Sequence, residues 1–319
     1  MLRVGIIGTG NHGSRYANHI VNDVAGLVLT AISRRADVGR AQAAQWKCRW
    51  HPDWHELVRD DQVEAVIAVV PPYLNLDIAR ACAEYGKPLL LEKPLAISST
   101  KAAQIVALCG AKNLRLTVGQ TLRYNPVVKR LRRELPSIGT LCGFSANQRL
   151  GPSSLLWHED PTLAGAGVTF HTAVHVFDAL RFITGLEVER VMAVVRRHRN
   201  GELEDLLAVL VEMQQDVVGT IDCSKVGHAR SGRYEFVGYK GQLHGDQVHN
   251  SMEFIHGTEI KSLDMGKAEN TIIPLLLDWQ AFLAGKGKNP ISGEDGLASV
   301  RLCAACLESS RSGNWVVVQ

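Results

Sequence analysis

The chain has 319 residues, 46% hydrophobic and 21% charged, a balance typical of a soluble globular enzyme and long enough for two domains. The net charge of +3 is small, and the densest basic run, "RLRRELP" at 130–136, is typical of the solvated face of a short helix, which excludes nucleic acid as the main partner. No apolar run reaches the roughly 18 residues of a membrane span, and Met1 leads directly into a predicted strand without a signal peptide, so we expect a cytoplasmic protein.

The first third of the chain alternates short apolar strands with helices. We predict strands at 2–7, 27–32, 65–70, 89–91 and 116–118. The helices predicted between them lie at 13–22, 37–46, 54–59, 74–85 and 98–111. Strands of continuous apolar character that alternate with helices predict a doubly wound parallel sheet, covered on both faces.

A glycine-rich turn, "GTGNHG" at 8–13, follows the first strand. Gly8 permits a tight turn, Gly10 lets a pyrophosphate approach the backbone, and Gly13 lets the next helix pack closely on the strand. The helix that begins here also offers backbone amides to phosphates. Because the motif lies between a strand and a helix, we predict a dinucleotide-binding site rather than a plain glycine turn, and we expect His12 to touch the cofactor.

The end of the second strand, "AISRRAD" at 31–37, indicates the type of dinucleotide. An NAD enzyme usually places an acidic residue here to bind the ribose 2′-hydroxyl. This chain has Ser33, Arg34 and Arg35 instead, and Asp37 comes too late for that role. Because a guanidinium binds phosphate with a two-pronged hydrogen-bonding fork, we predict NADP(H) rather than NAD(H). The alternative is that the arginines cap the next helix or lie in solvent.

The third and fourth strands end in "VVPPYLN" at 69–75 and "LLLEKPLA" at 89–96. Ligands of open α/β sheets bind at the carboxyl ends of the strands. Lys93 directly follows an apolar strand and precedes a proline that fixes the backbone, so we expect Lys93 at the cofactor edge of the sheet.

After residue 120 the predicted strands become longer and more widely spaced. They lie at 140–150, 188–198, 206–213, 217–224, 233–239 and 251–257, and the tail at 270–312 is helical. The strand in "EDLLAVLVEMQ" (204–214) is apolar on both alternating faces, which predicts helices of the same domain on one side and a partner subunit on the other. This half therefore predicts an α+β domain with a large, mostly antiparallel sheet.

The cysteines indicate a reducing compartment. The chain has seven, an odd and scattered set that does not suit a disulfide framework. Cys303 and Cys306 form a CxxC within the predicted C-terminal helix, and we interpret them as buried thiols rather than a redox or zinc pair.

A further helix is predicted in "GVTFHTAVHVFDALRF" at 167–182, where His171 and His175 lie four residues apart and Asp178 follows three later. Helical side chains at this spacing share a face, so both imidazoles could serve a metal, a catalytic centre or an ordinary core. "HTAVH" lacks a glutamate after the first histidine and the sequence supplies no third ligand, so we predict no metal.

Taken together, these motifs resemble the Gfo/Idh/MocA oxidoreductase family. The resemblance rests on "GIIGTGNHG", "LLLEKPLA", "GQTLRYNPVVKRL" and "WHEDPTLAGAGVTFHTAVHVFDALRFITG", with the EKP tripeptide as the most specific marker. It implies a dinucleotide-binding Rossmann domain at 1–121 and an open-faced, mostly antiparallel sheet domain with C-terminal helices at 122–319. It also implies a homodimer or homotetramer formed through that sheet, and a cis peptide bond between Lys93 and Pro94.

The resemblance implies roles for single residues. Lys93 would hydrogen-bond the reacting oxygen, His175 matches the catalytic histidine, and His171 is a third candidate catalytic residue. The residues expected to bind the cofactor are Gly8, Thr9, Gly10, Asn11, His12, Gly13, Ser33, Arg34, Arg35, Pro71, Pro72, Asn75, Glu92 and Lys93. Those expected to bind the substrate are Arg123, Tyr124, Trp157 and His158.

Three positions depart from the family pattern. His171 stands where the family has aspartate, His158 where it has arginine, and Asn75 where many relatives have histidine. Without the aspartate the cleft becomes more electropositive, which favours either an anionic substrate or the reductive direction. Two alternatives stay open: His171 could be a polar residue facing solvent or backbone, and Asp178 could either orient His175 or face the sheet.

We therefore predict an NADP(H)-dependent oxidoreductase. It would transfer a hydride between nicotinamide and a CH–OH or C=O carbon of a sugar, polyol or sugar-acid-like molecule. His175 would carry the proton, because imidazole titrates near working pH. The alternatives are a reductase of a C=N or C=C bond on the same scaffold, and a non-catalytic NADP-binding sensor.

Overall fold

In a computed structural model that describes residues 1–199 and 201–318, the chain divides into two compact units. The first contains Met1–Gln120 and Ile272–Leu297, and the second contains Thr121–Thr271 and the chain from Ala298 onward. The division after Gln120 lies beside the expected boundary at 121/122. The segment Ile272–Leu297 groups with the first unit, whereas the sequence had suggested that all C-terminal helices belong to the sheet domain.

The first unit is built on a six-stranded parallel sheet with the order β3-β2-β1-β4-β5-β6. Its strands are β1 (Leu2–Ile7), β2 (Leu27–Ser33), β3 (Arg49–His51), β4 (Ala65–Ala68), β5 (Leu89–Glu92) and β6 (Leu116–Gly119). The apolar side chains of the central strands are fully buried, among them Val4, Ile6, Ile67 and Leu90. This burial on both faces confirms the parallel sheet that the continuous apolar runs predicted.

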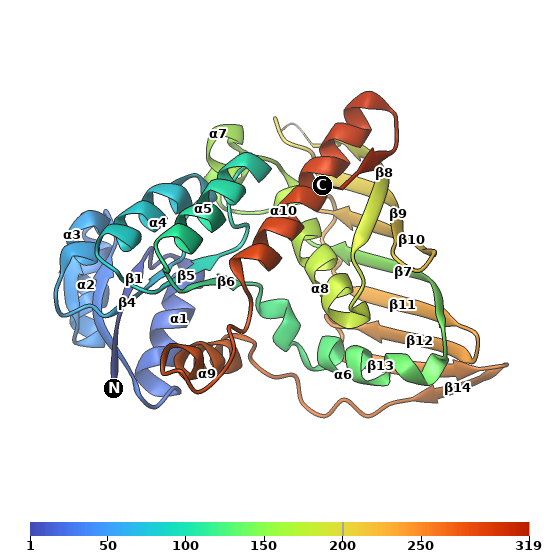
Figure 1. Ribbon diagram of the computed structural model, residues 1–319, viewed down its shortest axis with the longest axis horizontal. Coiled ribbons are helices and arrows are strands. Elements are labelled where there is room, and N and C mark those ends of the chain that lie inside the picture. Colours follow the sequence, from blue (N-terminus) through green and yellow to red (C-terminus); the bar gives the residue numbers. More distant parts are fainter. Residues whose placement is uncertain (200, 319) are drawn as a thin grey trace. The chain divides into compact units, whose positions relative to one another are not determined.

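Helices cover both faces of this sheet (Figure 1). They are α1 (Asn11–Asn22), α2 (Val38–Trp46), α3 (Trp54–Arg59), η1 (Pro72–Leu74), α4 (Asn75–Glu84), α5 (Ser99–Ala111) and α9 (Ile272–Leu283). One layer is formed by α1, which packs on α2 and α9, and the other by α4, which packs on α3 and α5. The contact with α1 explains why α9 belongs to the first unit although it lies late in the chain.

The strand order reverses at β1, which pairs with β2 on one side and β4 on the other. Ligands of such sheets bind in the crevice where the order reverses, beyond the carboxyl ends of the strands. The fold therefore brings the glycine turn after β1, the arginines after β2 and the residues after β4 to the same edge.

The second unit is built on a nine-stranded sheet with the order β14-β13-β12-β11-β7-β10-β9-β8-β15. Its strands are β7 (Leu141–Arg149), β8 (Val188–Arg196), β9 (Leu206–Met213), β10 (Val217–Ser224), β11 (Arg233–Gly238), β12 (Gly241–Asp246), β13 (Ser251–His256), β14 (Glu259–Ser262) and β15 (Val316–Val317). All pairings are antiparallel except that of β7 with β10. The structure thus confirms the mostly antiparallel sheet.

Helices cover one face of this second sheet (Figure 1). The helical elements of the unit are η2 (Thr121–Tyr124), α6 (Pro126–Glu134), η3 (Leu135–Ile138), η4 (Leu156–Glu159), α7 (Pro161–Ala164), η5 (Thr169–Ala173), α8 (Val174–Thr184) and the later part of α10 (Gly293–Ser312). Of these, α6 packs on β12 and α8 packs on β7. The side chains that face them form the core, among them Val209, Ile221, Tyr234 and Phe236.

The other face of the sheet is exposed in the single chain and carries an apolar strip on β8, β9 and β10. Met192 is 38% exposed, Val194 43%, Leu210 43% and Val218 49%. The register places Met192 opposite Leu210 and puts these side chains on one face. For the strand in 204–214, the sequence predicted helices of the same domain on one face and a partner subunit on the other. The structure confirms the helices.

The observed boundaries of most elements lie within two residues of the predicted ones. Four strands were not predicted: β3, β12, β14 and β15. Of these, β12 has the sequence "GQLHGD", in which Leu243 is the single large apolar side chain, and β14 is exposed along its whole length. Such strands form because neighbouring strands supply backbone hydrogen bonds, and a period-2 apolar pattern cannot detect them.

Candidate active site

The glycine turn has the geometry of a dinucleotide loop. Gly8 has φ 88°, and a Cβ there would lie 2.3 Å from the Val69 carbonyl oxygen. A Cβ on Gly13 would lie 1.9 Å from the Gly8 carbonyl oxygen, so only glycine lets α1 pack this closely. Around Gly10, the N-cap of α1, a Cβ would meet no atom within 4 Å, which leaves open space in front of the helix amides. These residues fit a pyrophosphate.

A pocket of about 480 Å³ opens beside this turn in the first unit. The predicted cofactor residues that line it are Gly8, Thr9, Gly10, Ser33, Arg34, Arg35 and Pro71. Eight residues that were not predicted also line it, among them Asp53, Trp54, His55 and Tyr73. Asp53 caps α3 by accepting from the His55 amide at 3.0 Å, and the Trp54 and His55 rings stack with their centroids 3.6 Å apart. The sequence signal for them was the N-cap in "PDWHEL", which follows the short β3.

The two arginines after β2 have different surroundings. Arg34 turns inward, and its Nη1 donates to the Thr9 carbonyl at 2.5 Å and to Gln42 Oε1 at 3.2 Å. Gln42 Nε2 donates to the same carbonyl at 3.1 Å. Arg34 and Gln42 therefore both hold the Thr9 carbonyl of the glycine turn in place. Arg35 is exposed at the rim of the pocket. Arg34 therefore supports the glycine turn, a role that neither sequence interpretation named, whereas Arg35 is exposed to solvent at the pocket.

The EKP turn follows β5 at the same edge of the sheet. The Lys93–Pro94 peptide bond is cis, which confirms the expectation drawn from the resemblance. Lys93 is half-buried; burial lowers its pKa and the neighbouring Glu92 charge opposes that shift. A lysine with a lowered pKa can act both as a hydrogen-bond donor and as a proton-transfer group near neutral pH.

Glu92 is buried and holds three groups around it. Its Oε1 accepts from the Tyr16 hydroxyl at 2.5 Å and lies 3.1 Å from His12 Nε2, while Oε2 accepts from the Lys93 amide at 3.1 Å. Burial acts to raise the Glu92 pKa, but the hydrogen bond from His12 leads a set of contacts that together lower it. Glu92 is thus held as a carboxylate between the glycine turn and Lys93.

Asn75 does not lie where the resemblance placed it. It is 1% exposed, and its Nδ2 donates to the carbonyl oxygens of Pro94 at 3.2 Å and Leu95 at 3.1 Å. Pro72 is likewise buried at the start of η1 and is not among the residues that line the pocket. Asn75 therefore fixes the backbone after Lys93, and it is not among the residues that line the pocket.

In the second unit, the segment with the two histidines is not one regular α-helix. Residues Thr169–Ala173 form a π-helical turn, in which the Val174 amide bonds to the Thr169 carbonyl, and α8 begins only at Val174. His171 lies within the π turn and is 6% exposed, whereas His175 lies on α8 and is half-buried. The insertion of a π turn alters the i, i+4 relation on which the shared-face prediction depended.

His171 belongs to an aromatic cluster that we call the Trp157–His158–His171 cluster. The His158 and His171 rings stack with centroids 4.1 Å apart at 23°, and Trp157 meets His171 edge-on at 5.3 Å. Trp157 also meets His158 at 4.1 Å and 89°. The alternative that His171 faces solvent is therefore wrong. His158 and His171, the two histidines that depart from the pattern expected from the resemblance, contact each other.

The start of the π turn is held from two sides. Glu204 accepts from the amides of Gly167 and Thr169, both at 3.0 Å, and so caps the free N–H groups of the turn. A Cβ on Gly167 would lie 2.0 Å from the Glu204 carbonyl oxygen. The Cys303 thiol donates to the Thr169 carbonyl at 3.1 Å, and both Cys303 and Cys306 are buried free thiols of α10, as predicted.

Arg123 and Asp178 form a buried, two-pronged ion pair. Arg123 Nε donates to Asp178 Oδ2 at 2.8 Å, and its Nη2 donates to Oδ1 at 2.7 Å. The Asp178 side chain is fully buried and that of Arg123 is 11% exposed. Both Asp178 oxygens thus serve η2, and Arg123 joins η2 to α8. Tyr124 is also buried, with Lys129 Nζ 4.9 Å from its ring centroid.

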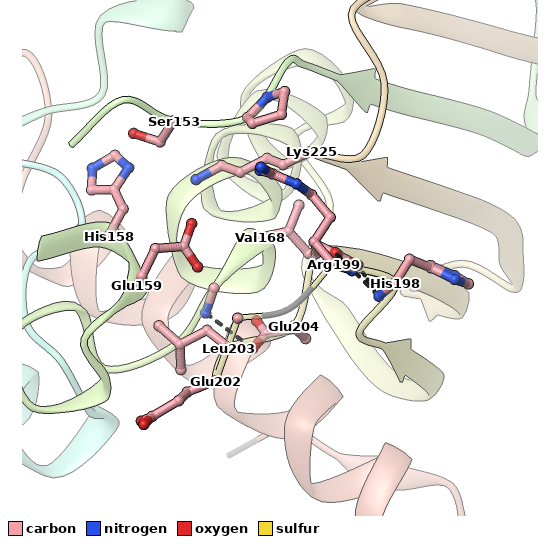
Figure 2. A pocket seen from close by; sticks show the side chains of 14 residues that line it. Ser153, His158, Glu159, Val168, His198, Arg199, Glu202, Leu203, Glu204 and Lys225 are labelled. Atoms are coloured by element: carbon pink, nitrogen blue, oxygen red, sulfur yellow. Dashed lines mark hydrogen bonds between the residues drawn. The ribbon is translucent and has the colours of Figure 1, made fainter. Parts of the chain in front are cut away.

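A second pocket, of about 720 Å³, lies beside the cluster in this unit (Figure 2). Its lining includes Ser153, His158, Glu159, Arg199, Glu204, Asp205 and Lys225. Figure 2 shows Lys225 reaching into the same space as His158 and Glu159. Glu204 is engaged by the π turn, and Asp205 accepts from the amides of His198 and Arg199. Of the four carboxylates in the lining, Glu204 and Asp205 are therefore engaged by backbone donors, and the other two are Glu159 and Glu202.

Two kinds of site are not found in the described parts of the chain. No group of three or more His, Cys, Asp or Glu side chains among the described residues could hold a metal ion. None of the described helices is long and apolar enough to cross a membrane.

Family models match both halves of the chain. Residues 2–120 match the model described as "Oxidoreductase family, NAD-binding Rossmann fold", named GFO_IDH_MocA. Residues 137–244 match the model of the GFO/IDH/MocA C-terminal domain.

The chain is also similar to proteins named as dehydrogenases. It is 28% identical to inositol 2-dehydrogenase 1 of Saccharopolyspora erythraea, covering 100% of this chain and 96% of that protein. It is 30% identical to inositol 2-dehydrogenase of Acidothermus cellulolyticus, covering 76% of this chain and 72% of that protein. Among solved structures, levoglucosan dehydrogenase in complex with NADH and levoglucosan superposes with a TM-score of 0.89 at 21% identity, covering 99% of both chains. At that identity the superposition shows a shared fold.

Proposed function

Because the chain belongs to the Gfo/Idh/MocA oxidoreductase family, we propose that it is an NADP(H)-dependent dehydrogenase of a sugar, polyol or sugar acid. The observation that carries the proposal is the contact between the glycine turn and the EKP turn. His12 Nε2 lies 3.1 Å from Glu92 Oε1, so Lys93 lies at the same sheet edge as the dinucleotide loop. The similarity to inositol dehydrogenases supports a hydroxylated substrate.

The proposed division of labour follows from the residues. A bound nicotinamide dinucleotide supplies hydride exchange with a substrate carbon. Lys93 donates a hydrogen bond to the reacting oxygen, and its lowered pKa favours this role near neutral pH. His175 exchanges the proton, and the Trp157–His158–His171 cluster shapes the substrate site. Glu204 caps the π turn, and Arg123 joins η2 to α8 through Asp178, so both hold the elements that carry these groups.

NADP(H) is the proposed cofactor, with Arg35 as the residue that recognises the 2′-phosphate. Arg35→Ala should weaken NADPH binding about 10- to 100-fold, the value of a charge-assisted hydrogen bond of ~1.5–3 kcal/mol, and leave NADH binding nearly unchanged. Arg34→Ala should weaken both cofactors alike, because Arg34 braces the Thr9 carbonyl. Fluorescence titration measures the dissociation constants of both variants for NADPH and for NADH, with the exposed Arg59→Ala as the control. Tighter binding of NADH than of NADPH by the unaltered protein would sink the proposal.

The substrate is proposed to carry a carboxylate or phosphate. His171 lies in the aromatic cluster at the position where the resemblance expects aspartate. The adjoining pocket has Lys225 and Arg199 in its lining, beside the carboxylates of Glu159, Glu202, Glu204 and Asp205. The test is a panel in which inositol and glucose are compared with gluconate and glucose 6-phosphate at matched concentration, with each cofactor. The anions should have the higher kcat/KM, and Lys225→Met should raise KM for the anions alone. Equal turnover of neutral and anionic substrates would rule this preference out.

A second copy of this chain is the proposed partner of the open sheet face. The strip formed by Met192, Val194, Leu210 and Val218 is exposed, and apolar patches of this kind mark interfaces. The neighbouring pairs Arg190–Glu212 and Arg149–Asp222 give the strip a charged rim. Sedimentation at micromolar concentration should show a dimer or tetramer, and a monomer under those conditions would refute the proposal.

A further inference from the structure

His12 connects the dinucleotide loop to the buried carboxylate beside Lys93. Its Nε2 lies 3.1 Å from Glu92 Oε1, the oxygen that also accepts from the Tyr16 hydroxyl. Its ring meets the Tyr16 ring edge-on with centroids 5.4 Å apart. The other Glu92 oxygen accepts from the Lys93 amide at 3.1 Å. A single carboxylate thus joins α1, which follows the glycine turn, to the EKP turn.

The position of His12 also relates it to the phosphates of a dinucleotide. It is the second residue of α1, two positions after the N-cap Gly10, where open space lies in front of the helix amides. The His12 side chain is 39% exposed, whereas Glu92 is 6% exposed. An anion bound at this helix terminus would lie on the solvent side of the ring, with Glu92 on its buried side.

We propose that His12 is a positioning residue whose protonation links dinucleotide binding to the Glu92–Lys93 pair. A neutral imidazole donates from one nitrogen, and a protonated imidazole donates from both. The cation can therefore serve Glu92 and a bound phosphate together, whereas the neutral ring serves one. The inference rests on the proposed dinucleotide site. It adds to that site a residue whose protonation changes when the dinucleotide binds.

The charges around His12 give the direction of the effect. Two charged groups lie close to the ring: Glu92, whose Oε1 is 3.1 Å from His12 Nε2, and Lys93, which acts electrostatically on Glu92. On α1 itself, Tyr16 is kept neutral because burial, followed by the Glu92 charge, raises its pKa, and Arg15 adds a further positive charge nearby. Bound phosphates add negative charge and favour the cation. Binding should therefore take up a proton, and affinity should fall as pH rises through the imidazole range.

The test is calorimetric titration of the full-length protein with NADH between pH 6 and 9, in pairs of buffers that differ in ionisation enthalpy. NADH is used because it lacks the 2′-phosphate monoester, which itself titrates at a pH of about 6. The unaltered protein should show proton uptake on binding, with affinity about three- to tenfold weaker at the high end of the range. His12→Gln keeps a donor for Glu92 but cannot titrate, so its binding should be independent of buffer and nearly independent of pH.

One histidine serves as a matched control. His19 lies on the last turn of the same helix, where its Nδ1 is 2.6 Å from Asp23 Oδ2. His19→Gln should keep the proton uptake of the unaltered protein, as should Tyr16→Phe, which removes the other hydrogen bond to the same Glu92 oxygen. Thermal unfolding without cofactor shows whether His12→Gln is folded.

Uptake that persists in His12→Gln would overturn the inference and leave the proposed function standing. Absence of uptake in the unaltered protein, measured without any substitution, would overturn it equally. Failure of the unaltered protein to bind NADH or NADPH at any pH would overturn both the inference and the proposed function.

Discussion

Lys93→Ala should lower kcat about 10²- to 10⁴-fold, the usual contribution of a positioned acid–base group, while NADPH affinity changes little. Lys93 directly follows Glu92 at the dinucleotide edge, and burial lowers its pKa against the opposing charge of Glu92. Its ammonium group is thus poised to donate to a substrate oxygen, and the glycine turn that fits the pyrophosphate does not depend on it. Steady-state kinetics and cofactor titration on the same preparations separate the two effects.

Two further variants make this result specific. Lys93→Arg keeps the positive charge, but the arginine side chain does not lose its proton in the working pH range. The ionisation that Lys93 contributes to the pH profile of kcat should therefore disappear. Because burial lowers the Lys93 pKa, that ionisation should lie below the usual lysine range. Lys87 is the control: it is also buried, its pKa is also lowered, and it donates to the Asp60 carbonyl away from the site. Lys87→Ala should reduce stability but not kcat. A Lys93→Ala enzyme with nearly full turnover would contradict the proposed role.

The sequence predicted the first unit well because its signals are local. Continuous apolar strands are buried on both faces, and the three glycines of the turn lie close together in sequence at the junction of β1 and α1. The exception is α9, which packs on α1 although some 250 residues separate them. The periodicity of apolar residues within a helix does not indicate which distant helix it contacts. Local patterns identify elements, whereas long-range packing decides which unit an element joins.

Two predicted cofactor residues have side-chain partners in distant segments that the motifs did not indicate. Asn75 lies after the third predicted strand, as expected, but its amide is taken by the backbone of Pro94 and Leu95. Arg34 lies after β2, as expected, but the Thr9 carbonyl takes its guanidinium. The motif gives the position of such a residue along the chain, while its hydrogen-bond partners depend on which buried carbonyls would otherwise lack a donor.

The π turn explains why the histidine pair could not be resolved from spacing. A period of 3.6 residues gives His171 and His175 one common face, but Glu204 and Cys303 hold the backbone of Thr169 in a wider turn. His171 then reaches His158, and the two departures from the family pattern become a single stacked pair. A change at one of these positions alters the packing of the other, so they should be studied as a pair.

The exposed and buried arginine–aspartate pairs of the second unit allow a matched test of stability. Arg123–Asp178 and Arg149–Asp222 have the same two-pronged geometry, with donor–acceptor distances of 2.7 and 2.8 Å in each. The side chains of the first pair are 11% and 0% exposed, and those of the second are 52% and 43% exposed. Burial is therefore the main difference between them.

Asp178→Ala should lower the free energy of unfolding by about 3–5 kcal/mol, because it leaves the Arg123 guanidinium buried without its counterion. Asp222→Ala should change it by about 0–1 kcal/mol, since solvent screens that pair. Urea unfolding followed by tryptophan fluorescence measures both. Replacing both members of the buried pair, in Arg123→Met/Asp178→Leu, removes both charges and should recover much of the loss. Equal effects of the two aspartate substitutions would show that the Arg123–Asp178 pair does not anchor η2 to α8. A stable Asp178→Ala protein with a raised KM would instead support the role that the resemblance implied for Arg123, which is substrate binding.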